Sequence, residues 1–381
     1  MFRKRGGPTE AGHSLPFHHQ TESVVGNFCG EIPPVRHATC SIVGVTRSIK
    51  NVTLHAMNLL RRITRLALLP LAVVPAFLNA GQLKIGYSDW PGYTVFEVAN
   101  QKGWFKEAGV DVQMVWFDYS ASIDAFAAGK IDGDCMVGSD AMVTGATGAK
   151  SKFVALIDYS DGSDMIIGKP GVTSIKELKG QKVGVELTLV EHMLLFEALK
   201  QNGMSQSDVT LVPTPTNNTP QTLASGQVAA VGAWYPISGQ ALDQVAGSKR
   251  LFTSADAKGL IYDVLAVSPA SLAANHDDWV KVAAVFYKCV AYLMDPKTRD
   301  DAIKIMSAKV GANADVYAKN VPGTHFLTLT EAKVAYKKGP GLDSIYGSMS
   351  TSDKFNMENA VYKESQKPED YAAPSIVMGL K

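Results

Sequence analysis

Arginine and cysteine are scarce in most of this chain. Beyond residue 80 the only arginines are Arg250 and Arg299, both in polar stretches, and the only cysteines are Cys135 and Cys289. Two cysteines so far apart have neither the close spacing of a metal site nor the pattern of a disulfide framework. Both stand among apolar neighbours, so we expect two small buried hydrophobic side chains, with a single disulfide as the alternative.

Disorder and nucleic-acid binding are also excluded by what the composition lacks. The 381 residues are 46% hydrophobic and 19% charged, which fits a globular protein rather than a disordered or collagen-like one, and the length favours two domains. The net charge of +1 is unevenly divided, since 1–80 carry +6 and 81–381 carry −5. A mildly acidic body has no concentrated basic face, so we expect no nucleic-acid partner.

The first eighty residues have the pattern of a leader. From Met57, three arginines precede an almost wholly apolar run at 66–78 that closes on Ala80. This order is typical of a secretory signal peptide, and the run is shorter than the roughly 20 residues that span a bilayer. We therefore expect a signal peptide at 57–80 and a periplasmic protein, with a membrane anchor as the alternative. Residues 1–56 are polar and lack a sustained period, so we expect them to be a non-native or disordered leader.

From residue 83 onward, strand-like runs alternate with segments of helical spacing. The first of these are a strand expected at 83–87, a helix at 95–104 with Gly103 as its stop, and a strand at 110–117. The alternation begins again after Asp164, and from Asp277 the pattern is almost wholly helical. It predicts an α/β protein with mainly parallel sheets and helices on both faces.

Two segments echo each other in the two halves of the chain. In each, a helix is expected to end at a glycine, Gly129 or Gly226, and to lead directly into a strand. The repetition predicts two similar lobes with a cleft between them, and a pocket between domains is a common ligand site.

The two lobes are expected to be joined by two crossings that act as a hinge. We place the crossings near 159–164 and 259–263, since each segment contains a glycine and lies where one alternating unit ends. The first lobe would then hold 81–162 plus 265–381, and the second would hold 163–264.

A family resemblance rests on the segment 167–185, which reads IGKPGVTSIKELKGQKVGV. It resembles the periplasmic solute-binding proteins of ABC importers, in the nitrate, sulfonate and taurine branch. Segments 103–110 and 223–228 are similar to the same family, although Ala229 stands where that family usually has Asp. The resemblance covers about 82–365. It implies a type II periplasmic binding protein fold, a monomer with permease and ATPase partners, and no enzymatic activity, catalytic residue or cofactor.

A finer resemblance concerns the ligand. Segments 88–93, 116–119 and 185–187 together are similar to a subgroup linked to urea-carboxylase-type genes, which implies a urea- or guanidine-like solute. The alternatives are a binding protein for sulfonate, taurine or nitrate, and a pyrimidine-binding or pyrimidine-synthase relative. The synthase needs a cysteine-rich iron motif, which residues 81–381 lack.

The ends of the expected strands point independently to a cationic ligand. In open α/β sheets, ligands bind beyond the carboxyl ends of the strands. The residues expected there are acids, aromatics and a serine: Asp89, Trp90, Asp118, Tyr119, Ser139, Asp140, Glu186 and Trp234. No lysine or arginine is expected beside them, although an anion would normally be held by such groups, and no metal site is expected. Carboxylates can pair with a planar guanidinium and indole rings can stack on it, while helix capping is the alternative role for each acid.

Overall fold

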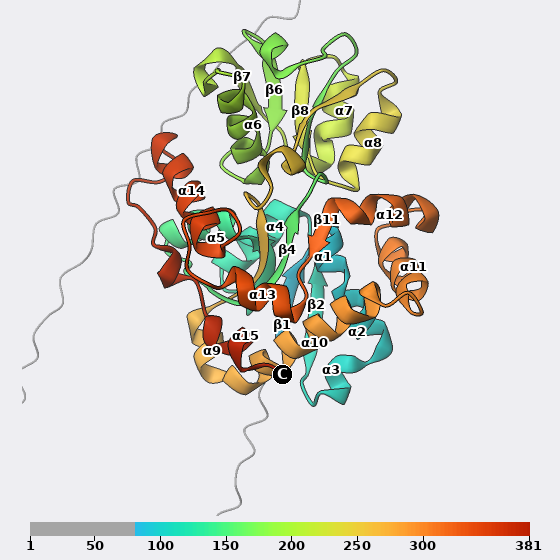
Figure 1. The fold of residues 1–381 in the computed structure, drawn as a ribbon, viewed down its shortest axis with the longest axis vertical. Coiled ribbons are helices and arrows are strands. Elements are labelled where there is room, and N and C mark those ends of the chain that lie inside the picture. The colour runs from blue at the N-terminus through green and yellow to red at the C-terminus, as the bar shows by residue number, and fades with distance from the viewer. Residues whose placement is uncertain (1–80) are drawn as a thin grey trace, which may run out of the picture. The chain divides into compact units, whose positions relative to one another are not determined.

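The computed structural model describes residues 81–381, and the expected signal peptide lies outside these residues. The described part of the chain forms two β-sheets flanked by helices, which gives the expected two-lobed α/β architecture (Figure 1). No helix among the described residues is long and apolar enough to cross a membrane.

The first sheet has six strands in the order β11-β4-β10-β3-β1-β2. Strand β1 runs parallel to β2 and β3, whereas β10 is antiparallel to β3 and β4, and β11 is antiparallel to β4. The bounds are β1 Leu83–Tyr87, β2 Val112–Trp116, β3 Gly133–Val137, β4 Lys152–Ser160, β10 Tyr262–Val267 and β11 Thr324–Phe326.

The second sheet has five strands in the order β7-β6-β8-β5-β9. Strand β6 is parallel to β7 and β8, and β5 is antiparallel to β8 and β9. The bounds are β5 Met165–Gly168, β6 Lys182–Val185, β7 Thr210–Pro213, β8 Ala230–Ala233 and β9 Lys249–Thr253.

The expectation of mainly parallel sheets is wrong, because both sheets are mixed. Strand β4 carries the chain toward the second sheet, and β10 brings it back. A strand that returns from the other lobe enters the first sheet from the opposite end, so it must run against β3 and β4. The expected crossings near 159–164 and 259–263 already imply that the strands beside them, β4 and β10, run in opposite directions.

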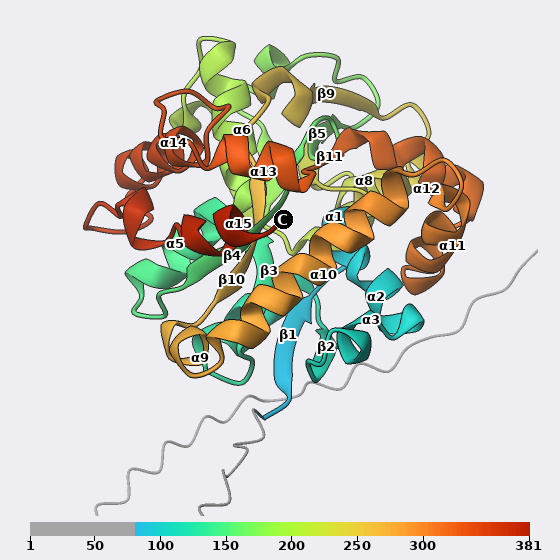
Figure 2. The same cartoon turned by 60° about the horizontal axis from the view of Figure 1, so that its bottom comes forward.

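Helices pack on the sheets, and the helical C-terminal part packs back on the first sheet. Figure 2 shows α10 lying across this sheet, where Trp279 is fully buried, and α13 and α15 also contact β4. The helices that accompany the first sheet are α1 Pro91–Thr94, α2 Phe96–Lys102, α3 Trp104–Glu107, α4 Tyr119–Ala127, α5 Gly138–Ala146, α9 Pro269–Ala274, α10 His276–Met294, α11 Arg299–Lys309, α12 Ala314–Asn320, α13 Leu329–Ala335, α14 Ile345–Glu358 and α15 Pro374–Gly379. Those of the second are α6 Val190–Gln201, α7 Thr219–Ala224 and α8 Ile237–Gln244.

Local sequence signals account for several of these boundaries. Gly129 and Gly226 follow α4 and α7 with φ of 66° and 71°, a left-handed conformation that glycine adopts without strain, as expected. The helix expected from Val95 with Gly103 as its stop is α2, which ends at Gly103 in the left-handed conformation (φ 71°), and the short α3 follows directly. Cys135 and Cys289 are both buried and free, which confirms the expectation of two small buried side chains over a disulfide.

The chain passes between the sheets twice, between β4 and β5 and between β9 and β10. The two connections touch through serine hydroxyls: Ser160 Oγ lies 2.7 Å from Ser254 Oγ, which also accepts a hydrogen bond from the Gly162 amide at 2.7 Å. The two crossings lie where the hinge is expected, and the hinge motion itself stays a prediction. The exact extents of the two lobes remain our proposal.

We expect Ser254→Ala to lower the free energy of unfolding by about 1 kcal/mol, because the part-buried Gly162 amide loses its partner and the Ser160 hydroxyl keeps only the Asp164 amide. Urea denaturation would measure the loss, with the exposed Ser225→Ala as the control. Equal stability of the two variants would show that this network does not hold the crossings together.

Candidate functional site

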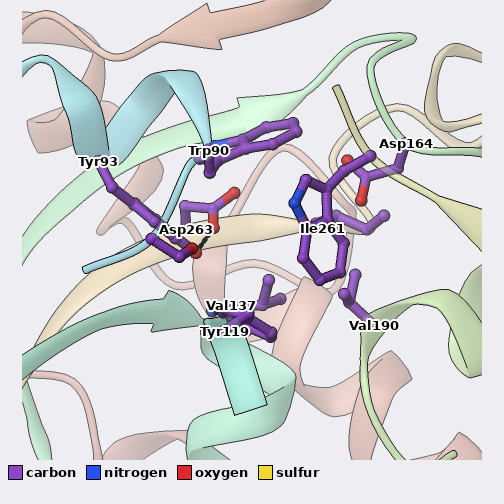
Figure 3. Close-up of a pocket in the computed structure, with 10 residues that line it drawn as sticks. Trp90, Tyr93, Tyr119, Val137, Asp164, Val190, Ile261 and Asp263 are labelled. Atoms are coloured by element: carbon purple, nitrogen blue, oxygen red, sulfur yellow. Dashed lines mark hydrogen bonds between the residues drawn. The ribbon is translucent and has the colours of Figure 1, made fainter. Parts of the chain in front are cut away.

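A small cavity lies between residues of the two lobes (Figure 3). Its walls combine aromatic side chains, two acids and small or aliphatic residues: Ser88, Trp90, Tyr93, Tyr119, Val137, Asp164, Val190, Trp234, Ile261 and Asp263. The free space left between them is about 10 Å³, close to the minimum that one water molecule requires. The lobes therefore lie close together at this point.

Three of the residues expected from the sequence line this cavity, and all three are aromatic. Trp90, just before α1, donates its indole N–H to both carboxyl oxygens of Asp158 on β4, at 3.1 and 3.2 Å. Tyr119 of α4 packs edge-on against Trp234, which follows β8, with ring centroids 5.1 Å apart. Aromatic faces from both lobes thus enclose the cavity.

Three expected acids surround the cavity without lining it, and their hydrogen bonds differ. Asp89 accepts from the Trp234 indole of the other lobe at 3.1 Å. Asp140 accepts from the Tyr119 hydroxyl at 2.7 Å and Glu186 from the Thr216 hydroxyl at 3.1 Å, each within its own lobe. The bond of Asp89 thus joins the lobes, and contact of these carboxylates with a ligand remains a prediction.

The other two expected residues, Asp118 and Ser139, do not line the cavity either. Asp118 is exposed at the residue before α4, where its side chain makes no capping bond. Ser139 is buried and donates its hydroxyl to Asp140 at 3.1 Å.

Two acids that the strand-end rule missed line the cavity instead. Asp164, just before β5, and Asp263, within β10, are 3% and 1% exposed, and the Oδ2 atom of each has no hydrogen-bond partner. Figure 3 shows their carboxyl groups at different sides of the cavity. Both belong to the expected crossing segments at 159–164 and 259–263. A segment that connects two lobes must pass the cleft between them, so the expected crossings could have pointed to these two acids.

Two further buried acids lie next to this pair and do not line the cavity. Asp158 lies beside Asp263, and Glu191 of α6 lies beside Asp164. Both are fully buried. Among residues 81–381, no lysine or arginine makes an ion pair with any of the four acids.

Burial controls the protonation of these groups. Loss of water raises the pKa of Asp164 to about 6, that of Asp140 to about 7 and that of Asp158 to about 8. The pKa values of Asp263 and Glu191 are raised further above the ordinary range, first by burial and then by the neighbouring carboxyl groups. A site made of uncompensated acids favours a ligand that brings positive charge.

The arrangement suits a ligand whose edges carry N–H donors and whose faces are flat. The two unpartnered oxygens can only accept hydrogen bonds when ionised, and the indole and phenol rings offer apolar faces. Within the described residues, no group of three His, Cys, Asp or Glu side chains is placed to hold a metal ion.

Comparison with known proteins gives matches of two kinds. A family model described as NMT1/THI5 like matches residues 90–298. A protein of Brucella abortus (strain 2308) that is named as a binding protein is 32% identical over 202 residues, covering 52% of this chain and 62% of the relative. A Haemophilus influenzae protein named for thiamine biosynthesis is 31% identical over 148 residues, 38% of this chain and 47% of that protein. The chain thus matches less than two thirds of either relative.

Solved structures share the fold at low sequence identity. The alkanesulfonate-binding protein from Xanthomonas axonopodis pv. citri, bound to MOPS, superposes with a TM-score of 0.65 at 18% identity, covering 77% of this chain and 98% of that one. The periplasmic nitrate-binding protein from Synechocystis gives a TM-score of 0.64 at 11% identity, covering 78% and 87%. These likenesses confirm the two-lobed periplasmic binding protein fold.

Proposed function

Because the chain belongs to the NMT1/THI5-like family, we propose that it is a solute-binding protein of an ABC importer. It would bind a small nitrogenous cation, of guanidinium type, between its lobes. The binding-protein fold and the relative that is named as a binding protein support the general role. The ligand class rests on the residues of the cleft.

One observation carries the ligand class: two buried carboxyl groups, Asp164 and Asp263, line a cavity walled by aromatic rings, and one oxygen of each has no hydrogen-bond partner. An unpaired buried carboxylate is costly, and the cost is removed when a cation with N–H donors pairs with it. A guanidinium has donors around its whole edge and two flat faces for Trp90 and Trp234, so it satisfies both features at once.

The small cavity indicates that the lobes must open to admit a solute. Movement at the two serine-linked crossings would separate the walls and expose the acids to water. We expect saturating guanidinium to reduce the radius of gyration of the ligand-free protein, which small-angle scattering would measure. A taurine sample is the matched control, and an unchanged radius with a bound solute would contradict closure by ligand.

Location and partners follow from the same role. We propose a periplasmic protein that delivers its solute to a permease and its ATPase subunits, as a monomer without enzymatic activity or cofactor. The structural neighbours described above include a periplasmic protein, and they support this location. N-terminal sequencing of the exported protein would test the signal peptide at 57–80, and a mature terminus well before Leu78 would contradict it.

A second candidate is a binding protein for a sulfonate or nitrate. The names of the two structural neighbours favour it, since one binds alkanesulfonates and the other nitrate. An anion would have to meet Asp164 and Asp263 in their neutral forms, because ionised carboxylates repel it. Its affinity would therefore fall as the pH rises, whereas the affinity for a cation would increase.

A third candidate is a pyrimidine, favoured by the Haemophilus influenzae relative that is named for thiamine biosynthesis. A pyrimidine ring could stack between Trp90 and Trp234, as a guanidinium could. A thermal-shift screen of refolded, ligand-free protein separates the candidates, using guanidinium, methylguanidinium, urea, taurine, nitrate and hydroxymethylpyrimidine. We expect the two guanidinium compounds to raise the melting temperature most, and a larger shift with any other compound would overturn this ligand class.

A further inference from the structure

Glu191 is a fully buried acid whose carboxyl oxygens have no N–H or O–H partner from its own helix. It is the second residue of α6, its side chain is 0% exposed, and within residues 81–381 no N–H or O–H group of a neutral or basic residue reaches either of its carboxyl oxygens. Its polar neighbour is the carboxyl group of Asp164, which lines the cavity. Two carboxyl groups in contact are stable together only when one of them carries a proton.

The second sheet leaves space for this side chain. A Cβ atom on Gly232 of β8 would lie 2.9 Å from Cβ and 3.0 Å from Cγ of Glu191, closer than carbon atoms can approach. Gly232 pairs with Ile166, two residues after Asp164, so the same strand pair holds both partners. The glycine therefore allows Glu191 to lie against the sheet beside Asp164.

We propose that Glu191 is a positioning residue, whose carboxyl group holds a proton, donates it in a hydrogen bond to Asp164, and so fixes the Asp164 carboxylate toward the ligand. The unpartnered Oδ2 of Asp164 is then left free for an N–H group of the solute. This inference rests on the proposed function, and it adds a residue that does not itself line the cavity.

The first lobe repeats the arrangement, which supports this role for a second carboxyl group. Asp158 contacts Asp263, receives the Trp90 indole N–H, and lies where a side chain on Gly92 would collide with it. Asp263 in turn accepts a hydrogen bond from Tyr93 and keeps Oδ2 unpartnered. Each lobe thus has one carboxyl group with an unpartnered oxygen and, next to it, a second acid. The second acid lies against a glycine, where a larger residue would collide with it.

The test compares two substitutions of Glu191 with wild type by titration calorimetry with guanidinium at pH 7.5. Glu191→Gln keeps an N–H donor to Asp164, so we expect its Kd to stay within about threefold of wild type. Glu191→Met has a similar size but no donor, and we expect Kd to rise about 10- to 100-fold, as for the loss of a hydrogen bond to a charged group. Melting curves check that both variants fold, and Gly232→Ala, which displaces Glu191, should weaken binding as Glu191→Met does.

Two results would overturn the role of Glu191: Glu191→Met binding as tightly as wild type, or folded Glu191→Gln losing as much affinity as Glu191→Met. A wild type that binds no guanidinium would instead overturn the proposed ligand class.

The stability of the ligand-free protein then tests the role of Glu191 independently. The titratable groups near Glu191 are Asp164, Glu186 and Asp140, so Glu191→Gln should be more stable than wild type at pH 8 but not at pH 5. Equal stability at both pH values would contradict the shared proton.

Discussion

Asp164→Asn is expected to abolish tight binding of guanidinium, raising Kd by about two to three and a half orders of magnitude at pH 8. At that pH the Asp164 carboxylate is ionised, because its pKa is about 6. Removing one partner of a buried ion pair costs about 3–5 kcal/mol, which corresponds to this change in Kd. Titration calorimetry on wild type and variant measures it.

The stability of the same variant separates a binding role from a structural one. Asp164 is 3% exposed with one unpartnered oxygen, so replacing it with the neutral amide should leave the melting temperature unchanged or higher. The control Asp243→Asn removes the same charge from an exposed position on α8 and should change neither quantity. Guanidinium binding by Asp164→Asn as tight as that of wild type would contradict a direct contact with the ligand.

Ligand-free protein should lose stability as the pH rises from about 4.5 to 8. The folded state raises the pKa of Asp164 to about 6, that of Asp140 to about 7 and those of Asp158 and Asp134 to about 8, all above their values in the unfolded chain. The folded protein therefore binds more protons than the unfolded chain, and stability present at low pH is lost as the pH passes each folded pKa. Asp164 alone accounts for about 2 kcal/mol over this interval.

A cationic ligand should oppose this loss. It stabilises the ionised carboxylates, so guanidinium affinity should rise about tenfold per pH unit below the pKa of Asp164 and then level off. Urea denaturation from pH 4.5 to 8, with and without millimolar guanidinium at constant ionic strength, measures both trends. Stability that rises with pH without ligand, or a ligand effect that falls with pH, would contradict the acidic site.

The fold could be predicted from the sequence because its signals are local. The strand at Leu83–Tyr87 and the helix ends at Gly129 and Gly226 depend on residues a few positions apart, and they lie where the pattern placed them. The direction of β10 follows from the expected crossing at 259–263, since a strand that returns from the other lobe runs against β4. The short strand β11 could not be predicted, because it depends on pairing with the distant β4.

Three aromatic residues of the candidate site could be predicted from the sequence, whereas its two lining acids were missed. Trp90, Tyr119 and Trp234 follow or approach strand ends, and the strand-end rule brings them to the cavity. Asp164 and Asp263 lie before a strand and within one, so the rule passes over them, although they stand in the crossing segments. Their burial and their unpartnered oxygens depend on contacts between distant segments, which only the folded structure provides.

A crystal structure of the protein grown with guanidinium tests the central claim most directly. We expect the cation between the rings of Trp90 and Trp234, with its nitrogens about 2.7–2.9 Å from the Oδ2 atoms of Asp164 and Asp263, the distance of a charge-assisted hydrogen bond. Crystals grown with taurine are the control and should show no solute in the cleft. A cleft that stays empty with guanidinium but holds the taurine sulfonate would contradict the cationic site, and would leave the two-lobed binding protein with an anionic ligand.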